Sequence, residues 1–363
     1  MMRGRAWVLS ALAAALVSPG GVGCTNLYRF QHVEHATVTR DGRLWLAGSE
    51  GFAAARDARG ARRLDYATSA ELEDPFYRGS LGPFPAARIV EAGGAVHLIT
   101  RAGDRFRWSG RGWRRAPLDL GQRDTFAHQL DFAAATSGGQ ILLYSNDGRL
   151  LWVDPSSGTP VAQERLFGHV HPMALDGDQL AGVGFEGLAR TIVRRTGTER
   201  WEKLATLPER PVLAFGRVRG EWVAVLDVGL VVVDDGGAAR FIGGRELFGR
   251  AAVSAPPDPG ATRTLLPAGT PLAEARIRSG GFWSIEQAFF LDGGGLVLAV
   301  RDKLVVLDGP GPWVPRPCDE VVAHIAAAAR LADGHTVVVS PTGALFELGA
   351  NRCREISTAL TSW

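Results

Sequence analysis

The stretch DGRLWLAGSEGFAAARDARGARRL, residues 41–64, contains two short apolar runs separated by glycine, followed by an arginine-rich run. It begins with Asp-Gly, a dipeptide that suits the tight turn of a β-hairpin because both residues tolerate positive φ. Similar combinations of a turn and an apolar run return further along the chain. The stretch therefore predicts a β-rich protein built from repeated hairpins.

Seven such units can be aligned on their turn signals, which begin at Asp41, Ala92, Ser137, Asp176, Val218, Asp292 and Asp333. Successive signals are 39 to 51 residues apart, except for one interval of 74 residues. A period of about 40–50 residues is typical of propeller repeats. The long interval could contain an eighth unit.

Each unit shows the same order of four predicted strands. An apolar run such as HATVT (35–39) precedes the turn, and a second strand follows it. Another turn leads to a third strand, such as RLLWVD (149–154), and a more polar run such as GTPVAQERL (158–166) closes the unit. One such sheet cannot bury both faces alone, but sheets stacked around an axis can. We therefore predict an all-β chain, a β-propeller of about seven four-stranded antiparallel blades, with eight or six as alternatives.

We expect the first strand of each unit to lie innermost, where crowding on both faces favours small residues such as those of FAAAT (132–136). The run AHIAAAARLA (323–332) also has strong helix propensity. Because it directly precedes a turn, at the place where the other units have a strand, we interpret it as a strand.

The chain resembles β-propeller repeat proteins over nearly all of residues 33–363. GRLLWVDPSSGTPVAQERL (148–166) is similar to a blade of the bacterial quinoprotein or YVTN-like propellers. DGRLWLAGSEGFAAARD (41–57) is similar to blades of the two-component-regulator sensor propellers. Each similarity covers one blade. The paired Gly-His and Trp-Asp of WD repeats are missing, and the double glycines of kelch repeats are not regular.

Residues 1–23 have the pattern of a signal peptide. Arg3 and Arg5 precede the apolar run AWVLSALAAALV (6–17), which is too short to span a bilayer and is followed by Ser-Pro-Gly. We therefore expect an exported protein, with residues 24–32 as an N-terminal tether and residues 33–363 as the propeller domain.

The motif GVGC (21–24) resembles a bacterial lipobox, in which small residues precede a cysteine that becomes lipidated. Gly23 and Cys24 match, whereas Gly21 stands where leucine is preferred. The resemblance implies a lipoprotein, anchored through Cys24 and facing the periplasm or the cell surface; the alternative is ordinary cleavage nearby and a secreted soluble protein. The other cysteines, Cys318 and Cys353, form an even pair that we expect to be a disulfide, with two buried thiols as the alternative.

Two segments depart from the repeat. Residues 65–87 join the first two units and carry acidic and aromatic residues. Residues 243–283 are rich in proline and too long for a plain turn, so we expect a loop insertion there, either covering one end of the propeller or simply variable.

Charge and motifs exclude several function classes. Lys and Arg total 40 and Asp and Glu total 38, and the excess of two basic residues comes from Arg3 and Arg5. A neutral chain without a basic run has no electrostatic reason to bind nucleic acid or an anionic membrane, so contact with a membrane is expected through the lipid anchor only. The sequence contains no serine-hydrolase elbow, zinc-protease motif or phosphate-binding loop. We assign no catalytic residue.

His169 and His171 in the run HVH are the nearest approach to a metal motif, because alternate residues of a strand face the same side. A third ligand would have to come from His35 or His324, whose offsets from the following turns differ. Two ligands placed by spacing are too few, so we predict no metal and no cofactor.

A broader set of polar residues occupies the first halves of the predicted innermost strands: Glu34, His35, Arg88, Asp131, His171, Glu286, Gln287 and His324. If these strands line a channel, the residues surround its mouth, and converging polar groups in a concave site favour ligand binding. The alternative is that strand starts are polar because they emerge from loops. We expect a binding or scaffold module for a protein or cell-envelope component; the alternative is a propeller enzyme, a lyase or glycan-active hydrolase.

Overall fold

The computed structural model describes residues 33–48, 53–57, 65–67, 86–100, 103–119, 130–166, 168–186, 189–243, 247, 285–300, 303–307, 314–317, 325–341, 343–349 and 353–357. The predicted signal peptide (1–23) and tether (24–32) lie outside these residues. So does the predicted insertion at about 243–283, apart from Gly243 and Leu247.

The described residues form seven four-stranded antiparallel sheets, and in each sheet the strands follow one another in sequence order. Blades 1 to 3 are formed by β1 (Val33–Val38), β2 (Arg43–Gly48), β3 (Ala53–Asp57) and β4 (Asp65–Ala67); β5 (Ala86–Ala92), β6 (Ala95–Thr100), β7 (Arg105–Trp108) and β8 (Trp113–Arg115); and β9 (Leu130–Ala135), β10 (Ile141–Ser145), β11 (Arg149–Val153) and β12 (Pro160–Arg165). Blades 4 and 5 are formed by β13 (Val170–Asp176), β14 (Gln179–Glu186), β15 (Ala189–Gly197) and β16 (Arg200–Leu207); and β17 (Val212–Val218), β18 (Glu221–Leu226), β19 (Gly229–Val233) and β20 (Ala239–Gly243). Blades 6 and 7 are formed by β21 (Gln287–Leu291), β22 (Gly295–Val300), β23 (Lys303–Leu307) and β24 (Val314–Pro317); and β25 (Ala327–Arg330), β26 (Thr336–Val339), β27 (Leu345–Leu348) and β28 (Cys353–Ser357).

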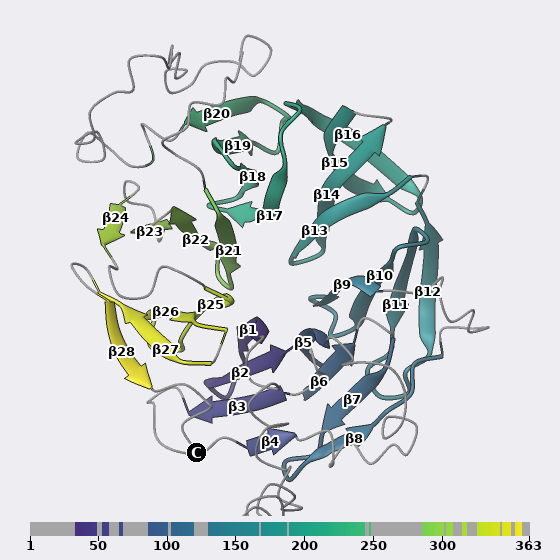
Figure 1. Ribbon diagram of the computed structural model, residues 1–363. Coiled ribbons are helices and arrows are strands. Elements are labelled where there is room, and N and C mark those ends of the chain that lie inside the picture. The colour runs from purple at the N-terminus through teal and green to yellow at the C-terminus, as the bar shows by residue number, and fades with distance from the viewer. Residues whose placement is uncertain are drawn as a thin grey trace, which may run out of the picture.

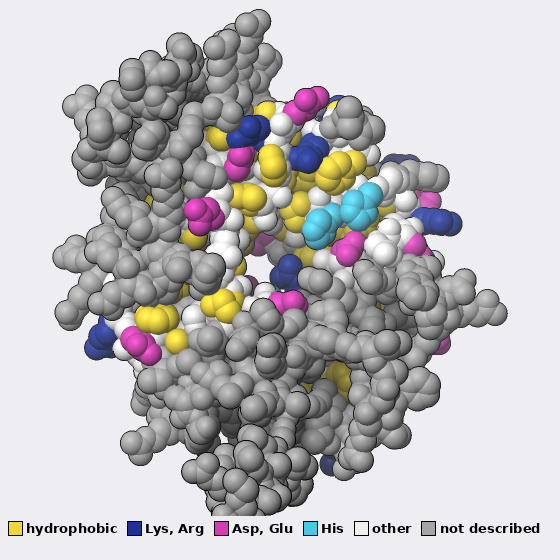
Figure 2. All heavy atoms as spheres, in the orientation of Figure 1, with side chains coloured by type: hydrophobic (Ala, Val, Ile, Leu, Met, Phe, Trp, Pro, Cys, Tyr) yellow, Lys and Arg dark blue, Asp and Glu magenta, His cyan; other side chains and the backbone are white. Residues whose placement is uncertain are grey.

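The blades are arranged in a ring, with the first strand of each blade nearest the axis (Figure 1). Each of these first strands contacts the first strands of the two adjacent blades, and β25 contacts β1, so the ring is closed. The space-filling view leaves an opening at the axis (Figure 2). The predicted β-propeller is therefore confirmed, and so is the strand interpretation of residues 323–332, because β25 lies within that run.

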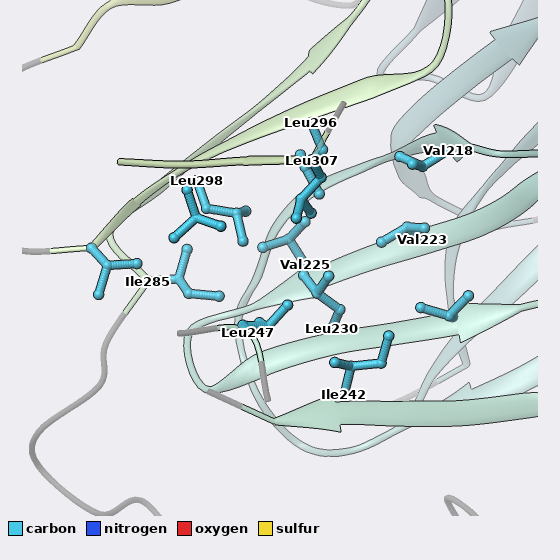
Figure 3. Packing of buried hydrophobic residues seen from close by; sticks show 13 residues of the cluster. Val218, Val223, Val225, Leu230, Ile242, Leu247, Ile285, Leu296, Leu298 and Leu307 are labelled. Carbon is cyan, nitrogen blue, oxygen red and sulfur yellow. The ribbon is translucent and has the colours of Figure 1, made fainter. Parts of the chain in front are cut away.

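The described residues form seven hydrophobic clusters, each between two adjacent blades. Figure 3 shows the cluster between blades 5 and 6, where Val223 and Val225 face Leu296 and Leu298. The strand EWVAVL (β18) explains why such strands are apolar throughout. Its odd-numbered valines face blade 6, whereas the alternate residues, including Trp222, pack toward blade 4. Because successive side chains of a strand point to opposite faces, a blade between two others buries both.

Blades 7 and 1 come from opposite ends of the described chain and close the ring. Their interface is an apolar cluster that includes Leu44, Leu46 and Val337, together with a hydrogen bond from the backbone N–H of Val33 to the carbonyl oxygen of Pro341 at 3.2 Å. Each blade takes its four strands from one continuous part of the sequence. Closure therefore depends on contacts between the two blades and not on a strand exchanged between them.

The tight turn between the first and second strands of each blade lies at one end of the ring, here called the hairpin face. Gly42 and Gly334 supply the required positive φ, 79° and 88°. Adjacent turns contact one another, as where the Ser137 hydroxyl donates to the Asp178 carboxylate. The first strands begin at the opposite end, here called the front face.

Candidate functional site

Five of the residues predicted to surround the channel mouth lie at the front face. Glu34, His171 and Glu286 are exposed, whereas Asp131 and Gln287 are half-buried. All five lie within the first two residues of a first strand or directly before it, and they come from four blades. They therefore surround the front opening and do not gather in one pocket. An eighth predicted residue, His324, lies outside the described residues.

The other two predicted residues, His35 and Arg88, are brought together deeper in the ring. Nδ1 of His35 accepts a hydrogen bond from the backbone N–H of Ile89 at 3.2 Å, and Ile89 follows Arg88 on β5. Because Nδ1 is the acceptor, the ring hydrogen of the neutral imidazole lies on Nε2. Burial, and then the nearby Arg88 charge, lower the pKa of His35 to about 3, so the ring is neutral near pH 7.

Arg88 lies on β5, the first strand of blade 2, which is nearest the axis (Figure 1). Its guanidinium carbon lies 5.6 Å from the ring centroid of Phe132 on β9, the first strand of the next blade. Burial lowers the pKa of Arg88, while the negative charge of Asp292 acts against that change. Asp292 follows β21 in blade 6, which is not adjacent to blade 2. Electrostatic contact between these blades requires both side chains to face the central space.

The channel is narrowed on the hairpin side of Arg88. The hydroxyl of Thr37 on β1 donates to Oδ2 of Asp292 at 3.1 Å. These residues belong to blades 1 and 6, so the hydrogen bond reaches past blade 7. Since β1 runs from the front face to the hairpin face, His35 precedes Thr37 along the channel. A molecule entering from the front would meet His35 and Arg88 before the Thr37–Asp292 pair.

An aromatic and apolar surface lies on the front face of blades 4 and 5. The ring centroid of His169 is 6.0 Å from those of both His171 and Phe185. Phe185 is 38% exposed and Leu213, near the start of β17, is 37% exposed. We call His169, His171, Phe185 and Leu213 the front patch. Figure 2 shows two adjacent histidine side chains beside hydrophobic ones near the opening.

The front patch is bordered by two arginines, Arg190 and Arg210, whose side chains are already engaged. The guanidinium of Arg190 lies 5.6 Å from the Phe185 ring centroid and donates to the carbonyl oxygen of Arg210. Arg210 in turn donates from Nε to Oδ1 of Asp227 at 3.0 Å. These contacts join blades 4 and 5 and hold the two arginines in place. Side chains restricted in this way lose less entropy when a partner binds.

Sequence reasoning did not identify Phe185 or Leu213. Phe185 looks like any strand residue, and its exposure arises because it lies near the end of β14 at the front face. Leu213 falls at an irregularity in pairing, since Val212 pairs with Leu226 and Ala214 with Val225. An extra residue of this kind is left outside the ladder. Neither feature has a distinct sequence signal.

A second hollow of about 300 Å³ lies between blades 3 and 4 and is lined by residues including Ser137, Trp152, Asp178 and Arg195. Arg195 already donates from Nε to Oε2 of the buried Glu164 at 3.0 Å and lies 4.9 Å from the Trp152 ring centroid. The carboxylate of Asp178 accepts a hydrogen bond from the Ser137 hydroxyl. The two charged groups that line this hollow, Arg195 and Asp178, thus already have partners in Glu164 and Ser137, which favours a role in joining the blades.

Among the residues that the structure describes, no group of three or more His, Cys, Asp or Glu side chains is placed to hold a metal ion. Nor does this part of the chain contain a helix with the length and apolar character needed to cross a bilayer.

Comparisons with known proteins support the fold. No protein-family model matches the sequence, and no curated protein matches it. The solved structure of YCF48 bound to D1 peptide is similar with a TM-score of 0.57 and 11% identity, over 89% of this chain and 94% of that chain. The structure of selenomethionine-substituted virginiamycin B lyase from Staphylococcus aureus is similar with a TM-score of 0.59 and 10% identity, over 88% of this chain and 95% of that chain.

PorZ, a surface component of the type-IX secretion system of Porphyromonas gingivalis, gives a TM-score of 0.57 and 13% identity, over 89% of this chain but 38% of PorZ. Identities this low show the β-propeller fold alone, because one fold serves many functions.

Proposed function

We propose that this protein is exported, carries a lipid anchor at Cys24, and binds a protein or another cell-envelope component through the front face of its propeller. The front patch is the observation that carries the binding role. Export and anchoring are supported by the sequence pattern of residues 1–24.

The exposure of the front patch is unusual for this chain. Among the described side chains, the exposed large hydrophobic ones are Val161, Phe185 and Leu213. Two of these three lie in the front patch, next to its pair of histidines and to Arg190. Aromatic residues and arginine are enriched where proteins bind one another, because they combine apolar area with directed polar contacts. This composition supports a polypeptide partner.

The structural neighbours are consistent with such a role, although their activities are their own. One is a propeller solved with a bound peptide, and another is a bacterial surface component. A third neighbour is a lyase of the same fold, which keeps the enzyme alternative open for this chain. The polar residues at the front opening would then be the candidates for chemistry, since active sites and binding sites alike occupy concave surfaces.

Capture from envelope extracts tests the binding role. Anchored protein should retain a specific partner, and Phe185→Ser combined with Leu213→Ser should weaken that binding roughly tenfold or more, because about 1–2 kcal/mol is lost per apolar contact. Val161→Ser on β12 is the matched control, since Val161 is 55% exposed but lies on an outer strand. Equal retention by both variants would contradict a role for the front patch.

The enzyme alternative has a different signature. His171→Ala and Glu286→Ala would abolish a defined turnover without loss of folding, and the double serine variant would not. Turnover of a small molecule by a protein that captures no partner would replace the binding proposal by that alternative.

A further inference from the structure

The channel contains an arginine, Arg88, whose hydrogen-bonding groups are not used by any residue that the structure describes. With the residues that the structure describes, Arg88 makes no side-chain hydrogen bond and no ion pair; its contacts are the Phe132 ring at 5.6 Å and the more distant charge of Asp292. Other half-buried arginines are paired, as Arg195 is with Glu164 and Arg210 with Asp227. An arginine held in a partly closed space without a partner is a ready receptor for an anion.

His35 adds a second donor beside this cation. Its Nδ1 is occupied by the Ile89 N–H, so Nε2–H remains to donate. The ring is neutral, because burial and the Arg88 charge both disfavour the imidazolium form. His35 therefore adds a hydrogen bond to an anion without adding charge.

The charge balance of the channel indicates the class of anion. Behind the acidic side chains of the front opening, Arg88 contributes one positive charge to the channel and Asp292, in blade 6, one negative charge. A singly charged anion next to Arg88 is attracted by the guanidinium, and the repelling carboxylate of Asp292 is more distant. A doubly charged anion such as phosphate doubles its attraction to Arg88 and its repulsion from Asp292 alike, whereas the cost of removing an ion from water rises with the square of its charge, so a single arginine favours the singly charged anion. A planar carboxylate also matches the fork of the guanidinium.

We propose that the channel of this propeller is a carboxylate-binding site, in which the Arg88 guanidinium and Nε2–H of His35 donate to the carboxylate of a ligand entering from the front face. The Thr37–Asp292 hydrogen bond limits how far such a ligand reaches. This proposal does not depend on the identity of the partner at the front patch.

Titration with sodium acetate, against sodium chloride of the same ionic strength, tests the site directly. The readout is the NMR signal of the His35 ring Cε1–H, assigned by its loss in His35→Asn. Wild-type protein should show a saturable shift with acetate. In Arg88→Gln the midpoint concentration should rise roughly 10- to 100-fold, because hydrogen bonds to charged groups contribute about 1.5–3 kcal/mol.

Arg40→Gln is the matched control. Arg40 is an exposed arginine in the turn that follows β1, and its backbone N–H, not its side chain, bonds to Glu91. This variant should keep the wild-type midpoint. Should Arg88→Gln not fold, Arg88→Lys preserves the positive charge and loses only the fork, and a several-fold weaker midpoint is expected. The proposal is overturned by an absent or unsaturable shift in the wild type, by an unchanged midpoint in the folded Arg88 variant, or by phosphate binding more tightly than acetate.

Discussion

Gly216 on β17 lies directly against the ring of Phe290 on β21, so closely that a Cβ atom on the glycine would come 2.4 Å from the ring carbons Cδ1 and Cγ. The two residues belong to the first strands of adjacent blades, where the sheets converge toward the axis. The φ of Gly216 is not positive, so the requirement for glycine here is space alone.

Gly216→Ala should therefore destabilise the propeller by about 1–3 kcal/mol, the cost of forcing an extra methyl group into a packed interface. Urea unfolding gives the measurement. In a Phe290→Ala background, the same change should be nearly neutral, because the ring that the methyl group meets is gone. Gly112→Ala is the control, since a Cβ there meets nothing within 4 Å and φ is not positive. Additive effects of the Gly216 and Phe290 changes would contradict this packing.

Much of the fold could be predicted from the sequence because the features that specify it recur in every unit. Tight turns are local, and the glycines that form them stand out in any unit. The run at 323–332 shows tertiary structure overriding propensity: its alanines favour a helix in isolation, yet Ala327, Ala328 and Ala329 are buried between blades and form β25. Position in the repeat indicated the strand; residue type alone did not.

The site was less accessible to sequence reasoning. The repeat places the starts of the first strands at one end of the ring, so the sequence predicts that residues there surround an opening. His35 and Arg88 are two of the residues predicted in this way. Their closeness depends on how blade 1 packs on blade 2, and the electrostatic contact of Arg88 with Asp292 joins segments far apart in the chain. No local pattern encodes such a contact. The same is true of Phe185 and Leu213, whose exposure depends on what the adjacent blade leaves uncovered.

Arg105 should be among the most sensitive positions of the interface between blades 2 and 3. Its side chain is buried and donates to the carbonyl oxygens of Ala116 at 2.9 Å and Pro155 at 2.7 Å. Arg105→Met fills similar space but leaves these acceptors unpaired, at about 1–3 kcal/mol each. Unfolding free energies should fall accordingly, whereas Arg107→Met, an exposed position on the same strand, should change little. Equal stability of the two variants would argue against the buried network.

His97 should make the stability of the protein depend on pH. Burial first, and then the nearby Arg105, lower its pKa from 6.5 to about 4. The unfolded chain takes up a proton below about pH 6.5 and the folded chain does not until about pH 4, so stability is lost as pH falls through this window. One such group contributes up to roughly 1.4 kcal/mol per pH unit. His97→Gln keeps an N–H that can donate to the carbonyl of Ala92, the acceptor 3.3 Å from Nε2 of His97, and removes the titration. Unfolding at pH 7, 6 and 5 should show a shallower slope for this variant; parallel slopes would contradict the assignment.

The disulfide of Cys318 and Cys353 remains a prediction. Cys353, at the start of β28, packs against the cluster between blades 6 and 7, and Cys318 directly follows β24 in the sequence. Cys318 itself lies outside the described residues. In unfolded, unreduced protein, alkylation should label neither cysteine, and reduction should expose two thiols. Cys353→Ser should lower the unfolding free energy by about 2–4 kcal/mol. Two labelled thiols without reduction would favour the alternative of buried free cysteines.

We expect Cys24 to decide where the propeller resides. If it is lipidated, its two acyl chains are sufficient for stable anchoring, whereas the neutral remainder of the chain offers little attraction to an anionic membrane. We therefore expect wild-type protein in the detergent-soluble membrane fraction and Cys24→Ala in the soluble fraction. Cys353→Ser keeps Cys24 and should remain with the membrane, which separates the loss of the anchor from the loss of a cysteine in general. Mass spectrometry of the N-terminal peptide should show diacylglycerol on Cys24. Membrane association of Cys24→Ala equal to that of the wild type would place the attachment elsewhere and favour binding to another envelope component as its cause.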